Sequence, residues 1–433
     1  MHDGRGERRL HGDVPAQHAA AGVAPAGDRQ RDCRPDGDLQ HGVRRDPANP
    51  AHYGSRADSS GVSVPYGDWQ RRGDGHRQGA TDSLRVGFGG ELCGAQLRAG
   101  RRALGKGARR LADPVRGAGA EVGRLLTLPA VQTNLMKKVS YYLDFEALPF
   151  TEKDATAYPN FASLQPALYE SAQMFLSSIV WTGHFNDLFT TKTIYANQAI
   201  AAAYGLPPIT GTVLQPITPT GDMYSAGLLT QPALLVASNT NASGDDVIHR
   251  GLWVYYNLLC APALPPPPGN AASVAMSLTG ESTRQQAAYR DVVQPGVSGS
   301  GCGAGCHGRF DPFGLVTMNY DSIGRYRTTD PSTTPPNAPI DSSSVVAPGV
   351  LAGTTMPTPV SGVEDVAHMF VQGRQVSDCA ADTLATYMLE HSPDVEGSCD
   401  LGTVKDGFHT SGSFAQLFGS ILTSPAFATR DIH

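Results

Sequence analysis

The sequence predicts a mainly α-helical fold, preceded by a long segment without a folding pattern. Two observations after about residue 123 favour this fold class. Apolar residues recur at spacings of three and four in several separate segments, as they do in amphipathic helices. Glycine and proline residues end these segments, so each predicted helix is short. At 433 residues, the chain is long enough for two to four compact domains.

Residues 1–122 differ in composition from the rest of the chain. The first 120 residues hold 19 of the 28 arginines and 22 of the 49 glycines but a single lysine, and neither helical nor strand periodicity is sustained there. We interpret the segment as non-native, a G+C-rich reading frame translated out of phase. A disordered basic arm is the alternative.

The charge and hydropathy patterns exclude two classes of partner. The N-terminal arginines are dispersed among aspartates and no aromatic platform accompanies them, so nucleic-acid binding is not expected. No run of about 18 apolar residues occurs, so no transmembrane segment is expected. A signal peptide is not visible, and we expect that it was lost with the true N-terminus.

Residues 123–264 are predicted to form a helical domain. Helices are expected over 124–150, 163–180, 191–208, 225–240 and 249–270. Gly205 ends the third of these as a C-cap, and Pro207 prevents a restart.

Two further domains are predicted after the proline spacer at Pro265–Pro268, which cannot continue a helix. The first, over 270–348, contains a helix at 281–293 and a turn-rich stretch at 310–330. The second, over 349–433, is helical, and its segment 363–392 reads as two helices broken near Gly373.

The stretch GCGAGCHGRFDPFG, residues 301–314, carries the strongest chemical signal. Cys302 and Cys306 are followed at once by His307. Covalent haem attachment needs two thiols and an adjacent imidazole, usually spaced Cys-x-x-Cys-His. Here the spacer has one more residue, but its Gly-Ala-Gly sequence is small enough to bulge outward. A Cys302–Cys306 disulfide and half of a zinc site are the alternatives on these residues.

The other cysteines suggest structural roles. Cys260 follows an apolar run, which is typical of a buried free thiol. Cys379 and Cys399 are separated by a helix and a turn, and their pairing in an exported protein would contribute about 3 kcal/mol.

The residues around the Cys-His stretch resemble a known family. CGAGCHGRFDPFGLVTMNYDSIGRYR, residues 302–327, resembles the signature of the planctomycete cytochrome c-type multidomain bacterial proteins. The positions in register are Asp311, Pro312, Gly314, Asp321, Gly324, Arg325 and Arg327. Flanking segments such as 185–207 and 378–392 extend the resemblance over roughly residues 123–395. The three-residue spacer departs from the family pattern.

The resemblance implies a cytochrome c-like helical and loop domain at 270–348 that binds haem c covalently. It also implies an exported protein, periplasmic or at the cell surface. Cys302 and Cys306 would then form the thioethers and His307 would be the proximal iron ligand. Met356, about fifty residues downstream in a proline-flanked loop, is the expected distal ligand.

Arg325 and Arg327 have a planar fork suited to carboxylates. Two roles are open for these arginines and Asp311: they bind the haem propionates, or they pair with each other. We favour an Asp–Arg pair that braces the turn.

The predicted function is a c-type haem electron-transfer module of an exported multidomain protein. Its expected partner is a redox protein or an attached upstream domain. The alternative is an exported non-haem structural or interaction protein in which Cys302 and Cys306 form a disulfide. An enzyme site in the helical domain is a third hypothesis, but no nucleophile elbow, phosphate loop or H-E-x-x-H motif occurs. The paired acids Asp245 and Asp246 are expected to be solvated.

Overall fold

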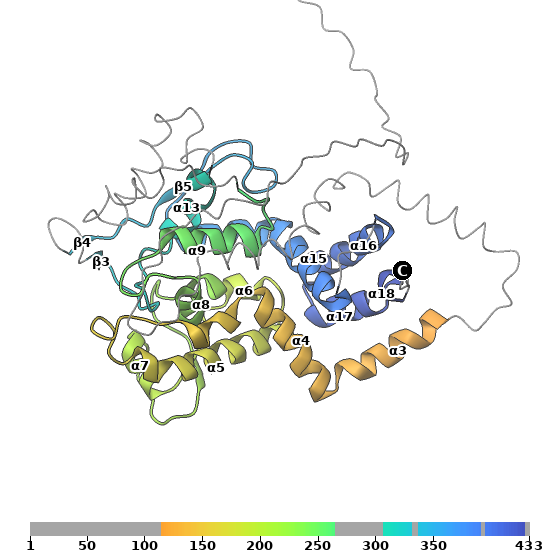
Figure 1. Ribbon diagram of the computed structural model, residues 1–433, viewed down its shortest axis with the longest axis horizontal. Coiled ribbons are helices and arrows are strands. Elements are labelled where there is room, and N and C mark those ends of the chain that lie inside the picture. The colour runs from red at the N-terminus through yellow and green to blue at the C-terminus, as the bar shows by residue number, and fades with distance from the viewer. Residues whose placement is uncertain (1–113, 265–305, 331–336, 391–394, 429–433) are drawn as a thin grey trace, which may run out of the picture. The chain divides into compact units, whose positions relative to one another are not determined.

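The computed structural model describes residues 114–264, 306–330, 337–390 and 395–428, which are coloured in Figure 1. These residues are mainly helical, as predicted, with three small two-stranded sheets. Of the segment interpreted as out of phase, residues 1–122, the part up to residue 113 lies outside this description, as does the helix expected at 281–293. Residues 114–122 are described and form most of a helix, Pro114–Leu126, so the expectation of no folding pattern is wrong for them.

The first part of the described chain runs from α3 to η3. Its helices are α3 (Pro114–Leu126), α4 (Pro129–Tyr142), η1 (Phe145–Phe150), α5 (Phe161–Val180), α6 (Asp187–Thr190), α7 (Gln198–Tyr204), η2 (Gly227–Thr230), α8 (Pro232–Ala237), α9 (Val247–Trp253) and η3 (Val254–Leu258). Its strands, β1 (Ile194–Ala196) and β2 (Gln215–Ile217), pair antiparallel.

Two of the predicted helices are corrected here. The segment 124–150 is not one helix, because Pro129 begins a new one after Leu128, and proline is accepted in the first turn of a helix. Residues 194–196 form β1 rather than the start of the third helix. The predicted end of that helix is confirmed, since Gly205 has φ 65° and caps α7.

The second part begins with α13 (Gly308–Leu315), where a turn was expected. The strands β3 (Thr329–Asp330), β4 (Ala338–Pro339), β5 (Ser344–Val346) and β6 (Thr358–Val360) follow it. They form two antiparallel hairpins, β3 with β4 and β5 with β6, and β5 packs against α13.

The chain ends in a helical segment, as predicted. It consists of α14 (Val363–Gln372), α15 (Gln375–Leu389), α16 (Val395–Ser411), α17 (Phe414–Leu422) and α18 (Pro425–Ala428). The break near Gly373 is confirmed. No helix in the described ranges is long and apolar enough to cross a membrane.

One large hydrophobic cluster extends from Leu135 in α4 to Ile421 in α17. The helix α5 contributes Leu164, Leu168 and Phe175 to it, on the face that the sequence periodicity predicted. Residues of all three predicted domains thus share one core, and the boundaries between those domains stay predictions.

The helices α9 and α13 pack closely, and Figure 1 shows them side by side. A Cβ added to Gly314 of α13 would lie 1.9 Å from the carbonyl oxygen of Val247. One added to Gly251 of α9 would lie 2.2 Å from the carbonyl oxygen of Phe310. The two backbones can approach this closely only because both positions are glycine.

A disulfide joins Cys260, just after η3, to Cys379 of α15. Their Cα atoms lie 5.5 Å apart, in the usual range for a disulfide. The predicted free thiol at Cys260 and the predicted Cys379–Cys399 pair are therefore both wrong. The two partners are separated by 119 residues and meet only because α15 packs against η3, a contact that local sequence does not reveal.

Candidate cofactor site

His307 and Asp311 form a pair at the start of α13. Nδ1 of His307 lies 3.1 Å from Oδ2 of Asp311, four residues on. This spacing places both side chains on the same face of the helix. The Asp311 side chain is fully buried and the His307 side chain is 15% exposed. The His307 ring also packs against Phe310, with a distance of 4.9 Å between ring centroids.

This pairing suits an imidazole that binds a metal. A carboxylate at Nδ1 accepts a hydrogen bond from the N–H of that nitrogen, which leaves the lone pair of Nε2 for an iron or another metal ion. Within the described part of the chain, nothing hydrogen-bonds to Nε2. The donor set at the start of α13 therefore fits the axial ligand of a haem.

Only one of the two predicted attachment cysteines lies among the described residues. Cys306 is partly exposed and directly precedes His307. Cys302 lies outside the described residues. The thioether pair therefore stays a prediction.

Met356 lies in the loop before β6, with 70% of its surface exposed. β6 pairs with β5, and β5 packs against α13, so the fold brings this hairpin to the helix that follows His307. The exposed Met356 side chain is accessible for coordination, and its role as the distal haem ligand stays a prediction.

Arg325 and Arg327 both have carboxylate partners within the protein. Nε of Arg325 lies 2.7 Å from Oδ2 of Asp321, whose Oδ1 accepts the backbone N–H groups of Ile323 and Arg325. Arg327 pairs with Asp245. Both are Asp–Arg pairs that brace the fold. Contacts of either arginine with haem propionates stay a prediction.

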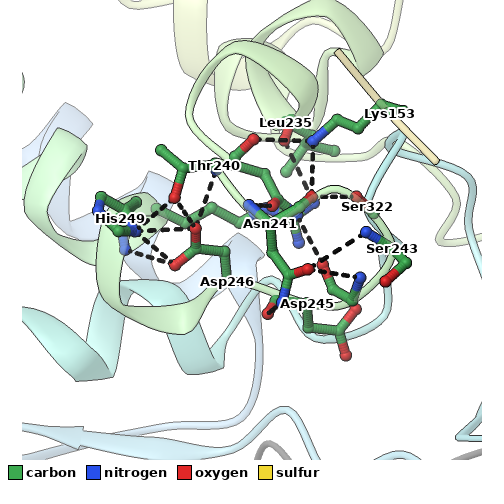
Figure 2. A network of polar contacts seen from close by, with 12 residues as sticks. Lys153, Leu235, Thr240, Asn241, Ser243, Asp245, Asp246, His249 and Ser322 are labelled. Atoms are coloured by element: carbon green, nitrogen blue, oxygen red, sulfur yellow. Dashed lines mark hydrogen bonds and ion pairs between the residues drawn. The ribbon is translucent and has the colours of Figure 1, made fainter. Parts of the chain in front are cut away.

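Asp245 and Asp246 belong to a polar network around the loop between α8 and α9 (Figure 2). Asp246 is the N-cap of α9 and accepts the backbone N–H of His249 at 3.0 Å. Burial tends to raise the pKa of Asp246, but the hydrogen bonds and charge of His249 hold it below its ordinary value. The prediction that these two acids are solvated is wrong, since their side chains are 7% and 9% exposed.

Lys153 approaches this loop from the segment between η1 and α5, as Figure 2 shows. Its Nζ donates to the carbonyl oxygens of Asn239 at 2.8 Å and Asn241 at 3.0 Å. Burial lowers the pKa of Lys153 to about 7. The loop is therefore fixed by an amine that is only partly charged near neutral pH.

Arg250 of α9 is buried and fixes the turn that follows α13. Its guanidinium donates to the carbonyl oxygens of Leu235, Thr317, Tyr320 and Asp321, at distances between 2.6 and 3.4 Å. Sequence reasoning missed this residue, and its signal was a basic residue directly before the largely apolar run GLWVYYNLL.

Metal sites of the cluster type are absent from the described ranges. No three His, Cys, Asp or Glu side chains gather there closely enough to hold an ion. A metal carried by His307 would therefore need ligands from a cofactor, from a side chain of another type such as Met356, or from residues beyond these ranges.

Two segments of the chain match known families. Residues 225–330 match the family described as PSCyt3, protein of unknown function (DUF1588), and include α9, α13 and the Cys306–His307 pair. Residues 108–206 match the family described as PSD4, protein of unknown function (DUF1592). Both are names of planctomycete cytochrome-like domains, and this supports the predicted resemblance to that group of proteins. No curated protein and no solved structure matches the chain.

Proposed function

We propose that this chain is a c-type haem-binding electron-transfer module of an exported multidomain protein. The observation that carries the proposal is the pairing of His307 with the buried Asp311 directly after Cys306. It presents Nε2 as a ligand in a stretch that also supplies thiols. The match to the PSCyt3 family over residues 225–330 supports the same assignment.

Cys302 and Cys306 would hold the haem as thioethers, His307 would bind the iron, and Met356 would be the distal ligand. A haem bound there supplies a one-electron carrier. Asp311 orients the imidazole, and the glycine contact between α9 and α13 fixes the helix that begins at His307. The electron would pass to or from a redox partner protein or an attached upstream domain.

The disulfide between Cys260 and Cys379 supports the exported location. Disulfides persist in oxidising compartments such as the periplasm and the cell surface, and they are rare in the cytosol. The same observation favours a second candidate function. In an oxidising compartment Cys302 and Cys306 could also pair with each other, and the chain would then be an exported structural or interaction protein without haem.

Haem content separates the two candidates. The full chain, exported in a host with c-type haem maturation that accepts the longer spacer, would be assayed by pyridine haemochrome spectroscopy after denaturation. We expect haem bands that survive denaturation and vanish in the Cys302→Ala/Cys306→Ala variant. The matched control, Cys260→Ser/Cys379→Ser, removes two other cysteines and should keep the haem. A colourless wild-type chain with no reactive thiol at residues 302 and 306 would refute the haem proposal in favour of the disulfide protein.

A further inference from the structure

The start of α13 contains a carboxylate that can act on the haem through its ligand. We infer that Asp311 is a positioning residue: it holds the His307 ring with Nε2 toward the iron, and its charge lowers the reduction potential of the haem. The inference rests on the proposed function, since it concerns the haem that His307 would bind.

The geometry fixes the ring from two sides. Nδ1 of His307 contacts Oδ2 of Asp311 at 3.1 Å, and the ring packs against Phe310 on the same helix. A rotation that exchanged the two ring nitrogens would break the contact with a fully buried carboxylate. Losing a hydrogen bond to a buried carboxylate is costly, so the surrounding structure favours one orientation of the ring.

The environment of Asp311 strengthens its effect on the ring. A charged group excluded from water acts more strongly on its neighbours than an exposed one. A carboxylate at Nδ1 makes the imidazole a more basic ligand through Nε2. A more basic ligand and a nearby negative charge both favour the oxidised haem, which carries one more positive charge than the reduced haem.

Other buried carboxylates in this region have different roles. Asp321 accepts backbone N–H groups and pairs with Arg325. Asp246 caps α9 and also contacts Nδ1 of His249 at 2.8 Å, within the same first turn of that helix. The imidazole that Asp311 contacts is the one that directly follows Cys306, and this position in the Cys-His stretch is what singles Asp311 out.

Asp311→Asn in the full-length haem protein tests the inference, because asparagine keeps the shape and an acceptor oxygen but removes the charge. We expect the midpoint of a redox titration to rise, so that the ratio of oxidised to reduced protein at a fixed potential falls at least tenfold, which is about 59 mV. The matched control is Asp382→Asn, which removes the carboxylate that pairs with Lys405 on another helix and should leave the midpoint unchanged.

A second measurement needs neither haem nor the Asp311 variant. In the full chain with Cys302→Ala/Cys306→Ala and ¹⁵N-labelled histidine, the signals of His307 can be assigned by their loss in His307→Gln. At alkaline pH we expect the proton on Nδ1 of the neutral ring. This readout keeps the inference testable if Asp311→Asn fails to fold.

The outcomes separate this inference from the proposed function. A wild-type chain with haem whose midpoint is the same in Asp311→Asn and Asp382→Asn overturns the role of Asp311 and leaves the haem site in place. A proton found on Nε2 overturns it as well. A wild-type chain without haem overturns both proposals.

Discussion

Gly314→Ala should destabilise the protein although alanine is the better helix former. The added Cβ would lie 1.9 Å from the carbonyl oxygen of Val247, whereas an ordinary contact between carbon and oxygen is about 3.3 Å. The helices α9 and α13 would have to separate by about 1.4 Å, the difference between those distances. A gap of this size removes much of the dispersion attraction between them. Because backbone rather than a flexible side chain must move, we expect the free energy of unfolding to fall by about 3 kcal/mol.

The control for this prediction is the same substitution at a glycine with open space. Gly407 lies within α16, and a Cβ added there has nothing within 4 Å. Gly407→Ala should therefore raise the free energy of unfolding by about 0.5–1 kcal/mol. Urea titration of the helical circular dichroism signal measures both variants. If Gly314→Ala unfolds at the wild-type midpoint or above it, the steric reasoning about α9 and α13 is refuted.

Three further predictions concern the contacts that tie distant segments together. Cys260→Ser/Cys379→Ser should lower the free energy of unfolding by about 2–5 kcal/mol, and a wild-type urea midpoint that is unchanged by a reductant would contradict this. Arg250→Met should cost about 3 kcal/mol or more, because four carbonyl oxygens lose their buried donor, and a variant with the wild-type urea midpoint would show that those hydrogen bonds do not matter. Lys153 releases its proton near pH 7 in the folded protein but at its ordinary pKa of 10.5 when unfolded, so the unfolded chain binds more protons between these values and stability should rise with pH. The unfolding free energy of the wild type minus that of Lys153→Met should therefore be larger near pH 10 than near pH 7. A pH-independent difference would mean that Lys153 titrates normally.

Local patterns explain which parts of the fold were predictable. The helix α5 and the break at Gly373 follow from apolar spacing and from a helix-ending residue, both of which are local. The strand β1 was missed because three residues carry too little periodicity to outweigh the helix-like sequence that follows. The partners of Arg250 and Cys260 lie far along the chain, so no local pattern could have identified them.

The candidate site was half predictable. The motif Cys306–His307 was visible in the sequence, but the partner of His307 was not identified. The signal was present, since histidine and aspartate four residues apart meet on one helix face. Pro312 and Gly314 made the segment resemble a turn, and the helix became apparent only with its packing against α9. Pro312 lies inside the short helix, where it lacks the N–H that would bond one turn back, and glycine fits because α9 leaves no room for a side chain.

The disulfide between Cys260 and Cys379 turns part of the chain into a covalent ring, 119 residues in sequence separation, that includes His307 and all of α13. A protease that cuts this ring once produces two polypeptides that remain one molecule. Such a nick is invisible by mass on a non-reducing gel and appears as two fragments only after reduction. Any cofactor attached within the ring would stay with the helical core after the cut.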